Sequence, residues 1–308
     1  VLSDMKNSGI QIVLVSSGAV SAGVAKVGFG SIPETPEAKQ AMAAIGQSEL
    51  MKIYDKFFSV YGHTVAQILM TKDVLTNPSR KSAAENTFNR LLEMNCIPIV
   101  NENDSVSTDE LTKFGGNDIL SAHVATLCEA DLLLSEGFIE PHFFAGYSGG
   151  RKSVLPGVAG KTTVLANHCS EFIADPAARA GSLKGNPIHR DMLWAAQQAG
   201  LKFIVNVVLN GHKQVIHAVA GDLSQAHEAG CNFLEGLCGA RCVSAPIAIT
   251  TNGGYPLDQN IYQAVKCMTA AEAVVHPGGV IIMASSCVDG HGGESFYQEM
   301  IAGDDMNA

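Results

Sequence analysis

His142 and Lys152 lie ten positions apart, on either side of a glycine-rich stretch that reads HFFAGYSGGRK. His168 follows sixteen positions after the lysine, within VLANHCSE. An imidazole titrates near neutral pH, so it can act as a general acid and base or bind a transition metal. A lysine that loses its charge by desolvation in an apolar turn can be a nucleophile or carry a cofactor. The stretch therefore predicts acid–base or cofactor chemistry, although a single histidine is more often a packed or surface residue.

The glycines and the Lys–Ser pair also suggest a phosphate-binding P-loop, in which the lysine directly follows the last glycine. Here Arg151 separates Gly150 from Lys152, and no compact apolar strand precedes the glycines. The sequence therefore argues against a P-loop, and we expect Lys152 to hold something other than a phosphate.

Polar residues follow two predicted strands in the first part of the chain. They form the segments SSGAVSAG (16–23) and NENDSVSTDELTKFGGND (101–118). Ligands of parallel α/β sheets bind beyond the carboxyl ends of the strands, and backbone N–H groups at a helix start can bind a carboxylate or phosphate. Amide and carboxylate side chains together suit an amino acid. Turn chemistry explains Asn, Asp and Gly equally well, so both interpretations stay open.

The composition limits the class of protein. The chain has 308 residues, of which 46% are hydrophobic and 16% charged, and its net charge is −10. This describes well-packed globular domains, and the negative charge argues against nucleic acid or an anionic membrane as partner. No apolar run reaches the roughly 18 residues of a membrane helix. We expect an enzyme that acts on small-molecule substrates, and a homo-oligomer is compatible with the sequence.

Eight cysteines are scattered through the chain without a C-x-x-C pair or a signal peptide. This usage predicts a reduced, cytoplasmic protein. Cys238 and Cys242 have a spacing that would let them bind a metal on one helix face, but a buried structural cysteine is the commoner state. The first residue is Val1, so the sequence suggests a fragment.

Strands and helices alternate along the chain, which predicts an α/β fold. Residues 1–135 predict a three-layer parallel-sheet segment, and residues 136–308 predict a second α/β segment without a linker between them. The predicted strands are 10–16, 64–70, 96–101, 131–135, 202–210, 245–254 and 279–285. The predicted helices start at Pro36 after Thr35, with Ala43, Leu50, Ile53 and Phe57 at helical spacing, and then span 79–95, 117–128, 221–238 and 258–272.

The first segment resembles glutamate 5-kinase, of the amino acid kinase family. The resemblance rests on VLVSSGAVSAG, AAIGQSELM, VAQILMTKDVL, NTFNRLLEMNCIPIVNENDSVSTDEL and FGGNDILSAHVA. It implies ATP and Mg²⁺ as cosubstrates and glutamate contacts at Ser17, Asp104 and Asn117. Gly116 replaces the family's acidic residue, and the segment after Asp104 is one residue longer than usual.

The ATP-binding elements of that family would precede Val1 and follow residue 135. Phosphoryl transfer depends on positioning and neutralising the γ-phosphate. We therefore expect a glutamate pocket without phosphoryl transfer.

The second segment resembles the nickel-pincer lactate racemase family. The resemblance rests on GFIEPHFFAGYSGGRKSVLPGVAG, NPIHRDML, FIVNVVLN and GGYPLDQNIYQAVKCM. It implies that Lys152 carries a pincer nucleotide covalently, that His168 completes the nickel coordination and that His142 is one of two acid–base histidines. Tyr262, Gln263 and Lys266 match residues that hold the carboxylate and hydroxyl of a 2-hydroxy acid. The glycines would let the cofactor approach the backbone.

Racemisation in that family is a transient hydride transfer from the substrate's α-carbon. The opposing histidine and a substrate-binding arginine belong to the family's amino-terminal domain, in whose place kinase-like sequence stands, so both segments are expected to be truncated. Three hypotheses follow: a racemase-like protein that is inactive or incomplete as this chain, a glutamate 5-kinase of proline biosynthesis with an unusual tail, and a fusion of two gene fragments without activity.

Overall fold

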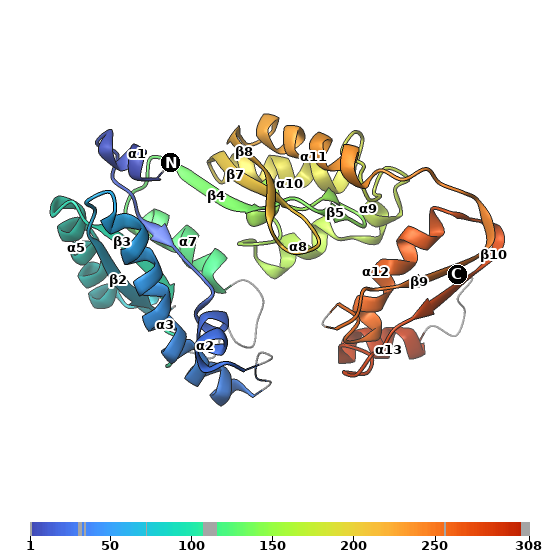
Figure 1. Ribbon diagram of the computed structural model, residues 1–308, viewed down its shortest axis with the longest axis horizontal. Helices are drawn as coiled ribbons and strands as arrows, with labels where there is room; N and C mark the ends of the chain where they lie inside the picture. The colour runs from blue at the N-terminus through green and yellow to red at the C-terminus, as the bar shows by residue number, and fades with distance from the viewer. Residues whose placement is uncertain are drawn as a thin grey trace. The chain divides into compact units, whose positions relative to one another are not determined.

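The computed structural model describes residues 2–29, 33, 35–71, 73–106, 116–255 and 257–302 (Figure 1). The chain divides into two compact units. The first comprises Val1–Leu134, Arg151–Val164 and Ala195–Phe203, and the second comprises Ser135–Gly150, Leu165–Trp194 and Ile204–Ala308. None of the helices in the described part of the chain combines the length and apolar character needed to cross a bilayer.

The first unit is built on a three-stranded parallel sheet with strand order β1-β3-β2. The central strand is buried at every position, as parallel strands with covered faces are. Ile97 and Ile99 pack with Ile12 and Phe58 on one face, while Val100 packs with Phe88 and others on the opposite face. The strands are β1 (Leu14–Val15), β2 (Val65–Met70) and β3 (Ile97–Glu102), and the helices are α1 (Leu2–Asn7), α2 (Ala19–Val27), α3 (Pro36–Ser59), α4 (Asp73–Thr76), α5 (Pro78–Glu93) and α7 (Gly116–Leu127).

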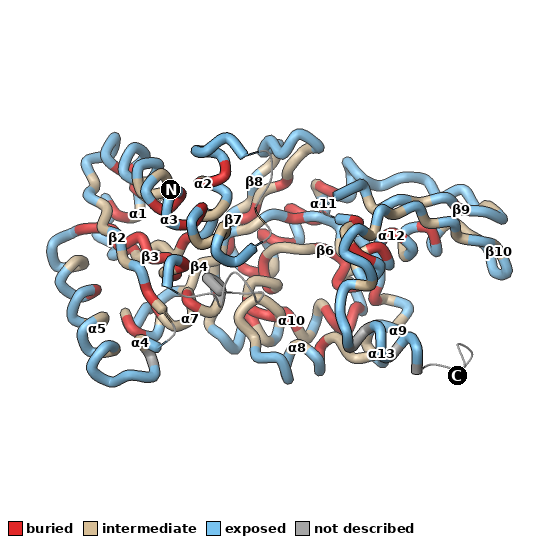
Figure 2. The backbone as a smooth tube through the Cα atoms, turned by 90° about the horizontal axis from the view of Figure 1, so that it is seen from below, coloured by how far each residue is buried: buried red, intermediate tan, exposed pale blue. Residues whose placement is uncertain are grey.

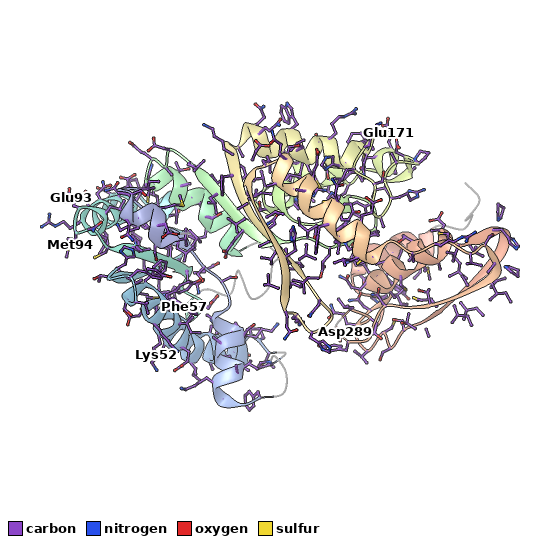
Figure 3. All side chains as sticks on the ribbon, turned by 45° about the horizontal axis from the view of Figure 1, so that its top comes forward. Lys52, Phe57, Glu93, Met94, Glu171 and Asp289 are labelled. Atoms are coloured by element: carbon purple, nitrogen blue, oxygen red, sulfur yellow. The ribbon has the colours of Figure 1, made fainter. Side chains whose placement is uncertain are left out.

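The expected start of the long helix is confirmed. The Thr35 Oγ1 atom accepts a hydrogen bond from Ala38 N at 3.3 Å, and Pro36 occupies the first turn of α3. The same device starts α5, where Asn77 Oδ1 accepts from Ser79 N and Arg80 N. The expected apolar face of α3 is only partly correct, because Phe57 is 65% exposed and points outward (Figure 3), whereas Phe58 is buried.

α2 and α3 cross at a pair of glycines. A Cβ atom on Gly46 would lie 1.7 Å from Ala19 O, and one on Gly23 would lie 1.9 Å from Met42 O. Since both obstacles are backbone atoms, only glycine at these two positions allows the helices to approach so closely.

Two strand predictions for the first segment need correction. The predicted strand 10–16 forms ladder pairs only at Leu14 and Val15, which face Ile99 and Val100 of β3. The predicted strand 131–135 is β4 (Leu133–Phe138), which belongs to a different sheet from β3. The apolar pattern predicts that a strand forms, but it does not predict which strand is its partner.

The second unit contains most of the sheet with order β4-β7-β8 and a short antiparallel pair, β5 and β6. The predicted helix 221–238 is α11 (Gln225–Cys238), and the residues before it form β8 (Val215–Asp222), which the sequence analysis missed. The other elements between β4 and β8 are β5 (Pro141–His142), β6 (Gly146–Tyr147), the 3-10 helix η1 (Gly150–Ser153), α8 (Lys161–Asn167), α9 (Ser170–Ala174), α10 (Pro187–Gln198) and β7 (Leu201–Leu209). Residues 151–164 and 195–203 among them belong to the first unit.

The last part of the chain forms a parallel pair, β9 (Ala245–Thr251) and β10 (Val275–Ala284), followed by α13 (Glu294–Ala302). The helix between the strands, α12 (Ile261–Glu272), packs on both of them (Figure 1). The Thr250 hydroxyl on the helix-facing side donates to Cys267 O at 3.3 Å. The opposite face is exposed and apolar, and its members are Ile247, Ile249, Val280 and Ile282. Figure 2 shows much of β9 and β10 in the colour of exposed residues.

Candidate functional site

An aromatic cluster in the second unit brings two of the predicted site residues together. His142, the last residue of β5, lies edge-on to the Phe144 ring with a centroid distance of 4.6 Å. His168, which follows α8, lies edge-on to the same ring at 4.9 Å. The fully buried Asn186 fixes this segment, because its Nδ2 donates to Phe144 O at 2.8 Å. The candidate acid–base residue and the candidate metal ligand therefore share one aromatic support.

The backbone fixes the orientation of the His142 ring. Ala145 N donates to His142 Nδ1 at 3.2 Å, so in the neutral ring the proton is on Nε2. Phe143 stacks on the ring at 4.9 Å. A neutral imidazole with its Nε2 proton in a defined direction is suited to exchange that proton with a bound hydroxyl.

Lys266 of α12 adds a cation to this cluster. Its Nζ atom lies 5.8 Å from the centroid of the Phe143 ring, within cation–π range. Partial loss of solvent around the ammonium lowers the pKa of Lys266 from its ordinary value. Beside it, a cavity of about 370 Å³ is lined by Phe143, Arg179, Ala180, Thr269, Ala270, Glu272 and Ala273.

Tyr262 and Gln263 lie on the first turn of α12, one turn before Lys266. Asn260 caps this turn, because its Oδ1 accepts from Gln263 N at 2.9 Å. The side chain of Tyr262 is 54% exposed, and Gln263 is half-buried. Both residues therefore lie on the same helix as Lys266.

Lys152 is half-buried in η1, directly after the fully buried Arg151. The glycines before it are needed by the packing of the protein itself. A Cβ on Gly149 would lie 2.9 Å from Asn206 Oδ1, and one on Gly150 would lie 3.0 Å from the His227 ring. The protein's own packing requires glycine at these two positions, so close approach of a cofactor is not needed to explain them.

His168 and Lys152 have the chemistry that a tethered metal cofactor needs, since an imidazole nitrogen suits nickel and a half-buried amine suits a covalent tether. Within the described ranges, no group of three or more His, Cys, Asp or Glu side chains could hold a metal ion.

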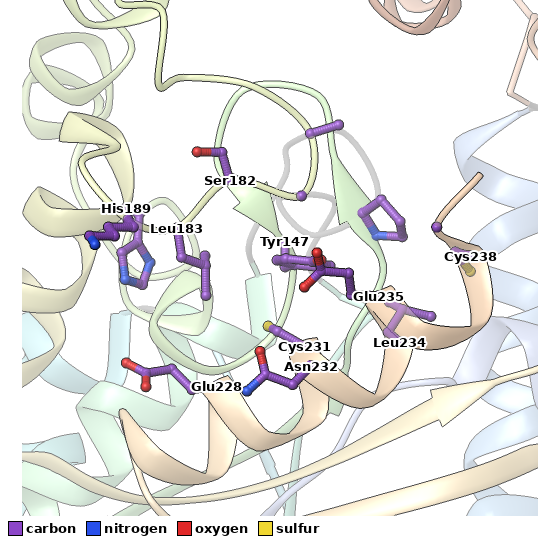
Figure 4. A pocket seen from close by; sticks show the side chains of 15 residues that line it. Tyr147, Ser182, Leu183, His189, Glu228, Cys231, Asn232, Leu234, Glu235 and Cys238 are labelled. Carbon is purple, nitrogen blue, oxygen red and sulfur yellow. The ribbon is translucent and has the colours of Figure 1, made fainter. Parts of the chain in front are cut away.

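A larger cavity, of about 920 Å³, lies along α11 in the second unit (Figure 4). Glu228, Asn232 and Glu235 line it from one face of the helix. Burial, together with the nearby Glu235 carboxylate, raises the pKa of Tyr147 on the same cavity. The sequence analysis missed this cavity, although the polar side chains recur at helical spacing.

The polar cluster of the first unit lies where β1 and β3 end, and α3 supplies half of it. Ser16 Oγ and Tyr54 Oη are 2.7 Å apart, Asn101 Nδ2 donates to Gln47 Oε1 at 2.8 Å, and Gln40 Nε2 donates to Asp104 O at 3.1 Å. The sequence analysis missed these three α3 residues, although they recur every seven positions and so share one helix face.

The predicted glutamate contacts differ in their surroundings. Ser17 is exposed at the start of α2, Asp104 is buried, and the side chain of Asn117 lies outside the described residues. The structure therefore places Asp104 within the cluster and Ser17 at its border.

Comparison with known proteins finds similarity to two families along the chain. The model of the amino acid kinase family matches residues 1–135, the model of the lactate racemase N-terminal domain matches 101–181, and that of the lactate racemase C-terminal domain matches 240–308. Glutamate 5-kinase of Enterococcus faecalis is 38% identical over 240 residues, which cover 76% of this chain and 84% of the relative. Lactate racemase of Thermoanaerobacterium thermosaccharolyticum is 60% identical over 170 residues, 55% of this chain and 40% of the relative.

The first part of the chain belongs to the amino acid kinase family, and the following part is similar to lactate racemases. The structure of the lactate racemase apoprotein from T. thermosaccharolyticum covers 94% of this chain with a TM-score of 0.58 and 40% identity, and the chain covers 64% of it. The chain thus spans less than two thirds of the racemases to which it is similar. The racemase match begins at residue 101, earlier than the expected residue 136, so the two families overlap over 101–135.

Proposed function

We propose that the part of the chain that is similar to lactate racemases binds a nickel-pincer nucleotide covalently at Lys152 and acts on a small 2-hydroxy acid. The observation that carries this proposal is the cluster in which His142 and His168 pack on Phe144 while the Lys266 ammonium lies over Phe143. It combines a proton carrier, a nitrogen donor for nickel and a cation for a carboxylate. When bound, the cofactor supplies a reversible hydride acceptor for the substrate's α-carbon.

His142 would exchange the hydroxyl proton of the substrate. Because Nδ1 accepts the Ala145 N–H, the ring gives or takes this proton at Nε2. Lys266 would attract the substrate carboxylate, and its partial desolvation strengthens that attraction. Tyr262 and Gln263, on the same helix, would hold the remaining polar atoms of the substrate.

The test is to produce the chain together with the enzymes that make the pincer nucleotide and to analyse its peptides by mass spectrometry. We expect an adduct on Lys152 that Lys152→Ala abolishes. Lys161→Ala is the matched control, since Lys161 is exposed on the first turn of α8. His168→Ala should keep the adduct and lose nickel, measured by elemental analysis. An unmodified Lys152 under these conditions would refute the proposal.

We also propose that the kinase-family part binds glutamate at Ser17, Asp104 and Asn117. The polar cluster formed by α3 with the ends of β1 and β3 supports this second function. Calorimetry should detect glutamate binding that Asp104→Asn weakens and that Lys52→Ala, on the exposed side of α3, leaves unchanged (Figure 3). Trapping γ-glutamyl phosphate as its hydroxamate, with Ser17→Ala as control, tests the alternative that this part phosphorylates glutamate with ATP and Mg²⁺.

A further inference from the structure

The glycine-rich turn that precedes Lys152 is held by two side chains from distant parts of the sequence. Gly149 and Gly150 both have positive φ values, 79° and 53°. Gly150 is also the first residue of η1, which carries Lys152. The direction in which η1 leaves the turn therefore depends on the conformation of these two glycines.

Asn206 of β7 bonds to the turn from one side. The residue is fully buried, and its Oδ1 accepts from Gly150 N at 2.9 Å. Its Nδ2 donates to Val205 O at 3.0 Å, so both ends of the amide are used. The carboxamide also fills the space that a side chain on residue 149 would need.

His227 of α11 bonds to the turn as well. It is 1% exposed, and its Nε2 lies 2.8 Å from Ser148 O. A carbonyl oxygen only accepts, so Nε2 carries the proton. The Nδ1 atom is then the acceptor of the neutral ring, and the Cys231 thiol lies 3.7 Å from it. The ring edge meets the position at which a Cβ on Gly150 would lie.

Burying two polar side chains completely is unfavourable unless their hydrogen bonds are made. Here Asn206 accepts from Gly150 N and His227 donates to Ser148 O, and an apolar side chain could form neither of these two bonds. Because glycine adopts positive and negative φ values about equally readily, the turn could take other backbone conformations. The two bonds select one of them.

We propose that Asn206 and His227 are positioning residues for Lys152. They hold the 148–150 turn in the conformation that presents the lysine amine, and the role of that amine as cofactor tether rests on the function proposed above. Neither residue needs to touch the cofactor or the substrate.

The first experiment requires no cofactor. The chain is pulsed with acetic anhydride, and acetylation of Lys152 is compared with that of Lys161 by peptide mass spectrometry. His227→Phe, which keeps the ring but not the N–H, and Asn206→Leu should raise Lys152 labelling about threefold or more while Lys161 stays constant. Hydrogen exchange at the Gly150 amide should accelerate about tenfold or more in Asn206→Leu, since this variant removes the buried acceptor of that amide.

A conservative variant separates positioning from general packing. His227→Gln can still donate to Ser148 O, so it should restore the labelling and exchange of the wild type. His217→Phe is the matched control, because His217 stacks on Phe233 at 3.9 Å on β8. Labelling and exchange in His227→Phe and Asn206→Leu that equal the wild type would overturn the proposal.

The second experiment measures the Lys152 adduct in the same variants after production with the cofactor-forming enzymes. We expect the adduct fraction to fall about fivefold or more in His227→Phe and Asn206→Leu and to recover in His227→Gln. A wild-type chain without adduct would refute the tether alone, and the labelling result would still decide whether the two residues position the amine. Full adduct in all variants would overturn the positioning role.

Discussion

Replacing Gly46 by alanine should separate α2 from α3 and disturb the glutamate-site cluster. The added Cβ would lie 1.7 Å from Ala19 O and 2.3 Å from Gly23 N. A carbon and a carbonyl oxygen normally stay about 3.3 Å apart. Since the obstacles are backbone atoms, the helices must move apart by about 1.5 Å.

The size of the effect follows from two opposing contributions. Overpacking of this kind costs about 3 kcal/mol at the upper end of the usual range. Alanine in place of glycine inside a helix gains about 1 kcal/mol. The net loss of about 2 kcal/mol corresponds to roughly thirtyfold in the local opening equilibrium.

The assay is hydrogen exchange of peptides from α2 and α3, because the chain has two units and a single unfolding free energy is not defined for it. Gly46→Ala should accelerate exchange in both helices by roughly thirtyfold. Gly236→Ala is the matched control, since its Cβ would meet nothing within 4 Å on α11. Glutamate binding should weaken as well, because Gln40, Gln47 and Tyr54 move with α3. Unchanged exchange in both helices of Gly46→Ala would refute the described crossing.

Three further predictions concern single side chains. Asn77→Ala removes the cap of α5 and should destabilise that helix locally by about 1 kcal/mol, seen as faster exchange of its first turn, whereas Asn77→Asp should not. Burial and Glu235 raise the pKa of Tyr147, so the unfolded chain loses this proton first: the contribution of Tyr147 to stability is intact below about pH 10 and declines above it. The urea midpoint of the second unit, followed by the fluorescence of Trp194 on either side of that pH, checks the sign, and Tyr147→Phe should show the smaller decline. Burial raises the pKa of Cys128 to about 11, so iodoacetamide at neutral pH should alkylate it more slowly than the exposed Cys238, and equal rates would contradict this.

Local signals in the sequence predicted local structure well. Thr35–Pro36 started a helix as expected, because capping and the fixed φ of proline act within a few residues. The missed strand β8 also had a local signal. Asn210–Gly211 is a strong hairpin pair, and Asn210 N bonds to Gln214 O across that turn.

The contacts that shape the site act over long sequence separations. Asn206 and His227 bond to a turn that lies 56 and 79 positions away along the chain. Nothing in the spacing of GYSGGRK indicates these partners. A glycine indicates that another group approaches the backbone closely, but it does not identify that group. The same holds for β4, whose apolar pattern could not show that it pairs in the sheet of β7 and not beside β3.

The segment from β3 through α7 to β4 has a consequence for how proteins of this class are assembled. Leu120, Val124 and Leu127 of α7 pack into the core beside β3, while β4 enters another sheet. Both family models include residues 101–135 of this segment. A helix that packs in one core up to its last residue, and is followed by a strand of a different sheet, is a suitable place to join two proteins. Engineered exchanges between α/β proteins could use such a helix as the joint and would need no added linker.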